Sequence, residues 1–195
     1  MINDFTRLIS ALTKLPGIGK KSATRLSYFL LKNKDKSKDI FISIVDFLDK
    51  ISNCSICGNF SSSDPCEICS SSNRDKKILC VVEEPSDLLA IEETGCYKGQ
   101  YHILMGNINP LEGKGPDNLR IGELLKRTKD GVFEEILIAT NPTIEGESTF
   151  LYLQNLLADQ NVKISKIATG IPMGGSLEYA DKYTLGRAIQ SKNYI

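Results

Sequence analysis

The 195-residue sequence has no tryptophan, a single histidine and no long apolar run. A membrane-spanning helix needs about 20 consecutive apolar residues, and the N-terminal MINDFTRLIS has no apolar stretch of the kind found in secretory signals. These absences predict a folded, soluble protein of the cytoplasm, where thiols stay reduced. Because His102 has no second histidine or nucleophile motif to act with, we expect it to be a hydrogen-bonded strand residue and not a general base.

The sequence also lacks an excess of charge of either sign, with 24 basic and 24 acidic residues. The distribution is uneven, however. Residues 1–53 hold ten Lys and Arg against five Asp, a balance of 10 − 5 = +5. An anionic partner is therefore expected to bind the N-terminal region.

The residue pattern changes along the chain and predicts an α/β protein with small modules. Residues 1–52 have helical apolar spacing, whereas residues 53–77 are rich in Cys, Ser and Asn and have too few large apolar side chains for a core. Short apolar runs at 78–82, 103–105, 136–139 and 162–164 alternate with amphipathic stretches, which indicates a parallel sheet covered by helices. We therefore divide the chain into residues 1–52, 53–77, 78–174 and a C-terminal assembly segment, 175–195, which is expected to be helical. The lysine-rich run 32–38 is expected to be a solvated loop, and the glycine- and proline-rich loop 106–117 a candidate binding loop.

Four of the six cysteines form two CxxC pairs, Cys54 with Cys57 and Cys66 with Cys69. Two such pairs place four thiolates around one tetrahedral ion and leave no open position for a substrate, which predicts a single structural Zn²⁺. Two disulfides are the alternative, disfavoured in a reducing compartment, and iron in the same four-cysteine site is another, because spacing does not select the metal. Cys80 is expected in the core and Cys96 as a free thiol.

The segment LPGIGKK at 15–21 joins two amphipathic helical stretches. Gly17 and Gly19 allow a sharp turn and close approach of another surface, and the following helix begins with free N–H groups that suit a phosphate. Lys20, Lys21 and Arg25 add positive charge there. The pattern is that of a helix-hairpin-helix motif, which binds DNA phosphates without reading bases; the alternative is a plain helix–helix turn with solvated lysines.

Acidic side chains follow two of the predicted strands. Glu83 comes directly after 78–82, and Glu145 and Glu147 follow 136–139 in the segment ATNPTIEGE. Together these segments resemble the Toprim fold, in which an acid after one strand and a DxDxE pattern after another hold Mg²⁺. Here Asn141 and Thr143 replace the two aspartates, which removes hard anionic ligands that Mg²⁺ requires. An active Toprim metalloenzyme acting on nucleic acid is therefore kept only as the alternative function.

The order of these modules, with the strings LPGIGKKSATRL, YHILMGNINPLEGKGPDNLRI, ATNPTIEGESTFLYL and GIPMGGSLEYADKYTLGRA, resembles the RecR family of bacterial recombination mediators. The resemblance implies a non-catalytic protein that forms a dimeric or tetrameric clamp on DNA. It also implies that the protein acts near the nucleoid with RecO, and with RecF where present, to help load RecA on single-stranded DNA. In this picture Gly17, Gly19, Lys20, Lys21 and Arg25 contact DNA, and Glu83, Glu145 and Glu147 are candidates for binding a basic partner surface. The C-terminal ending QSKNYI is less basic than the family leads us to expect.

Overall fold

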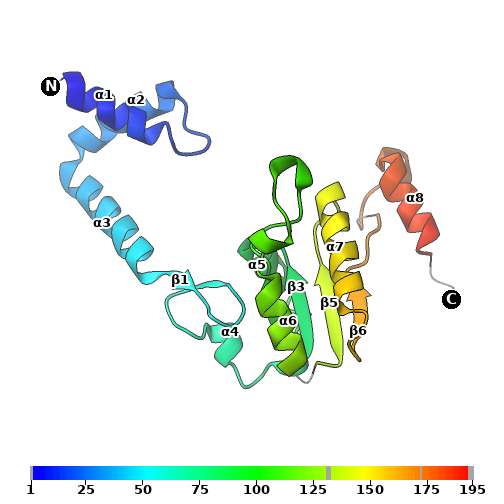
Figure 1. Ribbon diagram of the computed structural model, residues 1–195. Coiled ribbons are helices and arrows are strands. Elements are labelled where there is room, and N and C mark those ends of the chain that lie inside the picture. The colour runs from blue at the N-terminus through cyan, green and yellow to red at the C-terminus, as the bar shows by residue number, and fades with distance from the viewer. Residues whose placement is uncertain (1, 131–132, 172, 193–195) are drawn as a thin grey trace. The chain divides into compact units, whose positions relative to one another are not determined.

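The computed structural model describes residues 2–130, 133–171 and 173–192. The chain forms two compact units, Met1–Ile51 and Ser52–Ile195, which Figure 1 shows in blue and in cyan to red respectively. Within the described part of the chain, no helix is long and apolar enough to cross a membrane. Each unit is considered by itself below.

The first unit consists of three helices, α1 (Ile2–Leu12), α2 (Lys20–Lys32) and α3 (Lys34–Lys50). The helices α1 and α2 pack against each other, with the rings of Phe5 and Tyr28 4.9 Å apart. The prediction of a solvated loop at 32–38 is wrong, because α3 begins at Lys34. The buried hydroxyl of Ser37 donates to the Asn33 carbonyl at 2.8 Å and stabilises the first turn of α3. The sequence of this turn has no apolar periodicity from which a helix could be predicted.

The second unit begins with a small cysteine-rich module. Strands β1 (Ser52–Asn53) and β2 (Phe60–Ser61) pair antiparallel, and the one-turn helix α4 (Glu67–Ser70) follows. The buried apolar atoms of this module come mainly from its cysteines. This composition agrees with the expectation that the segment cannot build a core of its own.

The rest of the second unit is a four-stranded, all-parallel sheet in the order β4-β3-β5-β6. Its strands are β3 (Asp75–Val82), β4 (Gly99–Ile103), β5 (Glu135–Ala139) and β6 (Lys163–Lys166), joined through α5 (Pro85–Glu93), α6 (Ile121–Asp130) and α7 (Ile144–Leu157). The predicted α/β class is confirmed. The predicted position of one strand differs from the observed one. The apolar run 103–105 overlaps only the last residue of β4, and the buried positions of this strand include His102. Met105 lies beyond the strand and has φ +64°.

The central strand β3 is buried on both faces, as a parallel strand between helix layers must be. Leu79 and Val81 join a cluster with residues of α6 and α7, whereas Cys80 and Val82 point to the opposite face with Leu88 of α5. The expectation that Cys80 is a core residue is confirmed.

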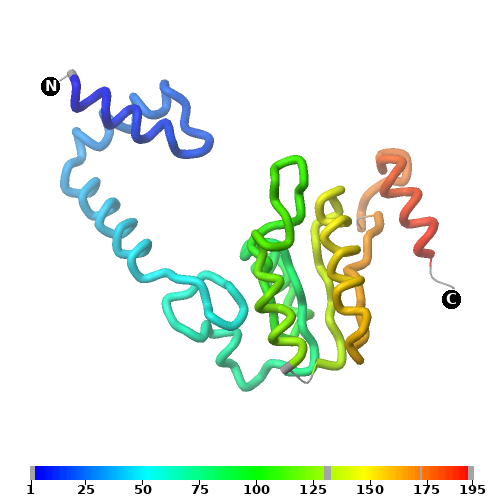
Figure 2. The backbone as a smooth tube through the Cα atoms, viewed as in Figure 1, coloured from blue at the N-terminus to red at the C-terminus, as the bar shows by residue number. Residues whose placement is uncertain are grey.

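The loop after β4 and the C-terminal segment complete the unit. The loop contains two short 3₁₀ helices, Pro110–Glu112 and Pro116–Asn118, and projects past the ends of the strands (Figure 2). The C-terminal segment has a 3₁₀ turn, Leu177–Tyr179, and the predicted helix, α8 (Lys182–Gln190). Asp181 caps α8 by accepting from the backbone N–H groups of Tyr183 and Thr184.

Candidate metal centre and nucleic-acid interface

The four predicted metal ligands come together in one site. The sulfur atoms of Cys54, Cys57, Cys66 and Cys69 all lie within 4.8 Å of one another, and the first three residues are buried. Asn59 donates its backbone N–H to Cys57 Sγ, and Cys66 donates its own to Cys54 Sγ, both at 3.4 Å. These N–H donors favour the thiolate form that a metal requires.

The crowding of the four thiols is itself evidence that the site suits a cation. The pKa of the Cys57 thiol is lowered to about 5, chiefly by a hydrogen bond from Cys69, while the pKa of Cys69 is raised, chiefly by that same hydrogen bond. Burial raises the pKa of Cys66 to about 11. A bound Zn²⁺ would supply the positive charge that allows all four sulfur atoms to be thiolates together.

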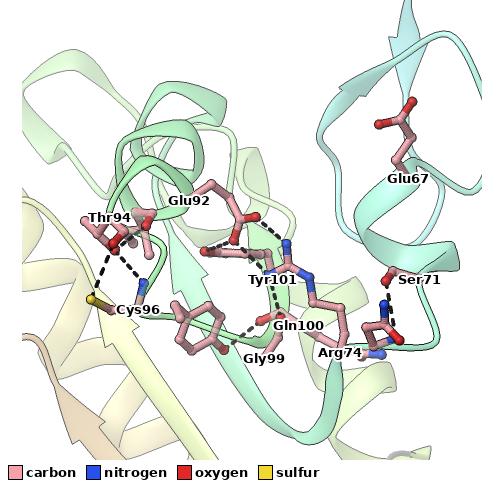
Figure 3. A network of polar contacts seen from close by, with 12 residues as sticks. Glu67, Ser71, Arg74, Glu92, Thr94, Cys96, Gly99, Gln100 and Tyr101 are labelled. Carbon is pink, nitrogen blue, oxygen red and sulfur yellow. Dashed lines mark hydrogen bonds and ion pairs between the residues drawn. The ribbon is translucent and has the colours of Figure 1, made fainter.

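The cysteine module is attached to the sheet by hydrogen bonds at two places. At the first pair, the Cys57 carbonyl accepts from the backbone N–H of Ile103 at the end of β4, at 2.8 Å. The second place is the C-terminal end of the module, just before β3, where Figure 3 shows Arg74 in contact with Glu92 of α5. The Arg74 Nη1 donates to Glu92 Oε1 at 2.8 Å, and the Tyr101 hydroxyl donates to the same oxygen at 2.7 Å. The module therefore has a fixed place on the parallel sheet.

The glycine hairpin of the first unit leaves the start of α2 open. Gly17 has φ +77°, and Gly19 is the N-cap of α2 and offers no side-chain cap. The side chains of Lys20, Lys21 and Arg25 are exposed. Free backbone N–H groups, the positive end of the helix dipole and three cations thus occur on one helix end, which is a suitable arrangement for a phosphate. Their contact with DNA stays a prediction.

The three predicted partner-binding acids have different surroundings. Glu83 is only 2% exposed. One of its carboxylate oxygens accepts from the Asn141 backbone N–H at 2.7 Å, and the other accepts from the side-chain amides of Asn107 at 2.9 Å and Asn141 at 3.2 Å. Because Glu83 is buried and bonded in this way, it joins the loops at the ends of β3, β4 and β5 and does not offer its charge to a partner surface.

Glu145 and Glu147 lie in the first turn of α7 and not at a strand end. Glu147 is paired within the chain, with Lys166 Nζ at 2.5 Å and Arg187 Nη2 of α8 at 3.3 Å. The hydrogen bond from Lys166 lowers the pKa of the Glu147 carboxyl below its usual range. Within the described ranges, the four cysteines are the only group of three or more His, Cys, Asp or Glu residues arranged to share a metal ion.

Gly146, between these two acids, is required by close packing. A Cβ at this position would lie 2.0 Å from the Asn141 carbonyl oxygen and 2.8 Å from Glu83 Oε1. The backbone of α7 thereby closes over the Glu83 carboxylate. The EGE segment thus has a packing role in addition to any role in binding.

The structure also shows a groove that sequence reasoning missed. It has a volume of about 1090 Å³ and lies between α5, the segment after β5, α7 and α8. Its lining includes Thr143, Ile167, Tyr183 and Arg187. Thr143, Tyr183 and Arg187 lie in the sequence segments quoted above, but no pattern predicts that they line one groove, because they come together only through the fold.

The fold and site define a class of protein: a helix-hairpin-helix unit followed by a four-cysteine finger on a Toprim sheet. Comparison with sequence families gives the same order. Residues 5–40 match the RecR helix-hairpin-helix, 51–71 the RecR four-cysteine zinc finger domain, 77–168 the Toprim domain and 170–193 the RecR C-terminal region. The match to a zinc finger family favours zinc over iron.

Curated relatives extend the similarity to nearly the whole chain. The chain is 48% identical over 190 residues to the recombination protein RecR of Heliobacterium modesticaldum and equally to that of Moorella thermoacetica, covering 97% of this chain and 96% of each relative. It is 46% identical over 189 residues to the protein of the same name from Tropheryma whipplei, covering 96% of both. The chain belongs to the RecR family of recombination proteins.

Proposed function

We propose that this chain is a non-catalytic DNA-binding mediator of recombinational repair. It would form an oligomeric clamp on DNA and act with RecO, and with RecF where present, to help load RecA onto single-stranded DNA. The observation that carries the proposal is the open N-terminus of α2 with its exposed cations, within a chain whose relatives are recombination proteins.

DNA binding is expected to depend on phosphate contacts by Lys21 and Arg25. These residues lie four apart on α2 and both are exposed, so they share one helix face. Replacing both with Ala should weaken binding to all DNA sequences alike and lower the slope of log K against log salt by about 2 per bound helix end, because about two counterions fewer are released. Fluorescence anisotropy at several salt concentrations measures both quantities.

The matched control removes two exposed cations elsewhere in the same unit. Lys36→Ala with Lys38→Ala changes the net charge equally, but on α3 and away from the hairpin. The hairpin variant should lose more affinity and more slope than this control. Equal losses would mean that only the overall charge of the unit matters and would remove the hairpin from the mechanism.

Self-association is supported by the exposed apolar surface of α3. The side chains of Ile40, Ile44, Val45 and Leu48 follow helical spacing, yet the first unit leaves all four exposed. A row of exposed apolar side chains of this kind is typical of a protein interface. A clamp built of several copies also multiplies weak DNA contacts, which is consistent with a net charge of zero.

Binding to a basic partner such as RecO is assigned to Glu145 and Glu147. Glu145 is tested first, because Glu147 already pairs with two cations of its own chain. Glu145→Gln should weaken capture of RecO, and Glu93→Gln, an exposed acid at the end of α5, should leave it unchanged. A Glu145→Gln protein that captures RecO normally and supports normal RecA loading would contradict the assignment.

The alternative function, an active Toprim metalloenzyme, is less well supported by the geometry. Glu83 is buried against three donors, and Asn141 and Thr143 stand where the Toprim pattern has acids. We therefore expect no binding of Mg²⁺ by calorimetry and no Mg²⁺-dependent cleavage or synthesis of DNA. Cleavage or primer synthesis that disappears with Glu83→Gln would support the enzyme instead.

A further inference from the structure

The guanidinium group of Arg120, the residue directly before α6, lies against the first cysteine pair. A Cβ built on Gly58, the residue directly after Cys57, would lie only 1.8 Å from Arg120 Nη1. Arg120 Nη2 donates to the Ser55 carbonyl, between Cys54 and Cys57, at 3.4 Å. The glycine with φ +88° thus leaves the space that the guanidinium fills.

The hydrogen bonds of Arg120 are incomplete within the chain. Its Nη1 atom is buried and has no hydrogen-bond partner among the described residues. Its Nε is 3.8 Å from Glu123, a carboxylate that is about half exposed, and such a contact contributes little in water. A buried cationic N–H group without an acceptor costs free energy of folding. A negative charge near Arg120 Nη1 would offset this cost.

A second arginine, Arg127 of α6, is held close to the same region. Its Nη1 donates to the Tyr101 carbonyl at 2.6 Å and its Nη2 to Gln100 Oε1 at 3.2 Å. Burial lowers the pKa of Arg127. His102 joins the two arginines, because its Nε2 donates to the Arg120 carbonyl at 2.8 Å and its Nδ1 accepts from Arg127 at 3.4 Å.

A zinc ion held by four thiolates has a formal charge of two negative units. In a mostly buried site that charge needs compensation, since desolvation is expensive for an uncompensated ion. Groups outside the ligand sphere that hydrogen-bond or neutralise the ligands adjust metal affinity. Arg120 brings a positive charge to the first cysteine pair, and Arg127 of α6 contacts the adjoining strand β4.

We propose that Arg120, supported by Arg127, is a positioning residue of the zinc site: its guanidinium balances the thiolate charge and holds the first cysteine pair on the Toprim sheet. Zinc binding and docking of the finger are then one coupled event. The zinc-bound site has the negative charge that stabilises the buried Arg120 Nη1. The positive charge of Arg120 in turn raises the affinity of the site for zinc.

The test uses the full-length protein and Zn²⁺ in competition with a chromogenic chelator. Arg120→Met keeps most of the length of the side chain and removes its charge, and it should raise the zinc dissociation constant about 10- to 100-fold. Lys126→Met, at an exposed cation of α6, is the matched control and should leave the constant unchanged. Zinc affinities of the two variants within about twofold of each other would overturn the proposal.

Conservative variants separate charge from simple packing. Arg120→Lys keeps the positive charge and Arg120→Gln does not, so Lys should recover part of the affinity that Gln loses. This comparison also decides the matter if Arg120→Met does not fold. Equal losses for Lys and Gln would show that the charge has no role and would overturn the proposal.

Discussion

At the residue scale, hydrogen bonds and burial decide what His102, Cys96 and Glu83 can do. His102 was predicted to be a satisfied strand residue, and both of its ring nitrogens are hydrogen-bonded. Cys96 was predicted to be a free thiol, and it is free and exposed. Glu83 was predicted to face a partner, but it is buried, because its three donors come from two distant loops that no local pattern connects.

The cysteine cluster gives the first residue-scale prediction. Cys66→Ser removes one metal ligand from a module with little apolar core, so it should cost folding and assembly first, by on the order of 4 kcal/mol, and DNA binding only as a consequence. Zinc content and thermal unfolding measure the loss. Cys96→Ser, at the exposed free thiol, is the control. A fully folded, normally assembled Cys66→Ser protein would show that the module does not depend on the metal.

The buried side chain of His102 gives the second residue-scale prediction. Burial lowers the pKa of His102 to about 3, below the value of about 6.5 expected in the unfolded chain. The unfolded state therefore binds one proton more between these values, so the contribution of His102 to stability is present above about pH 6.5 and is lost as the pH falls toward 3. His102→Gln keeps a donor for the Arg120 carbonyl and should reduce the dependence of unfolding free energy on pH by up to about 1.4 kcal/mol per pH unit in this window.

The comparison of wild type with His102→Gln at each pH isolates the histidine, since both proteins share the cysteine site and all carboxylates. Denaturant unfolding at about pH 7.5 and at several points below about pH 6 gives the two slopes. Identical slopes would mean that His102 binds a proton as readily in the folded protein as in the unfolded chain.

At the element scale, strongly periodic helices and apolar strands were predictable, and polar or irregular elements were not. The strands β3 and β5 stand out as apolar runs bounded by polar residues. The strand β4 was misplaced because Gln100 and His102 interrupt its apolar pattern, and the start of α3 was missed because a lysine-rich run has no apolar period. Local pattern fails where a polar side chain is buried through contacts made elsewhere in the fold.

A pair of glycine substitutions tests how tightly one helix end is packed. Gly146→Ala in α7 places a Cβ against the Asn141 carbonyl and should destabilise the protein by about 1–3 kcal/mol. Gly122→Ala in α6 meets nothing within 4 Å and should be neutral or stabilising by up to about 1 kcal/mol. Chemical denaturation of both variants gives the difference. A Gly146→Ala protein as stable as Gly122→Ala would disprove the close approach of α7 to the Glu83 loop.

At the scale of the whole molecule, the chain divides into two compact units. The apolar side chains of α3 were predicted as one face of an amphipathic helix, and the structure leaves them exposed, together with Phe41, Ile42 and Phe47. A contiguous group of exposed large apolar side chains is typical of a protein interface. The first unit by itself does not cover these side chains, which is the physical argument for assembly.

Assembly is therefore expected to fail when α3 becomes polar. Val45→Asp with Leu48→Asp replaces two side chains that are 54% and 66% exposed, so the single chain should fold while its mass in light scattering falls toward that of a monomer. Ser43→Asp adds a charge to the same helix without removing apolar surface and serves as the control. An unchanged mass for the double variant would place the interface elsewhere.

The sequence by itself determined the order of the modules, the four metal ligands, the hairpin cations and the α/β class, because each depends on residue types at short spacing. Only the tertiary structure decided the strand order, the burial of Glu83, the pairing of Glu147 with α8 and the position of Arg120 over the cysteine pair. These features join residues far apart in the chain. Their energies depend on burial and on the charges that the fold brings near, which short spacing does not contain.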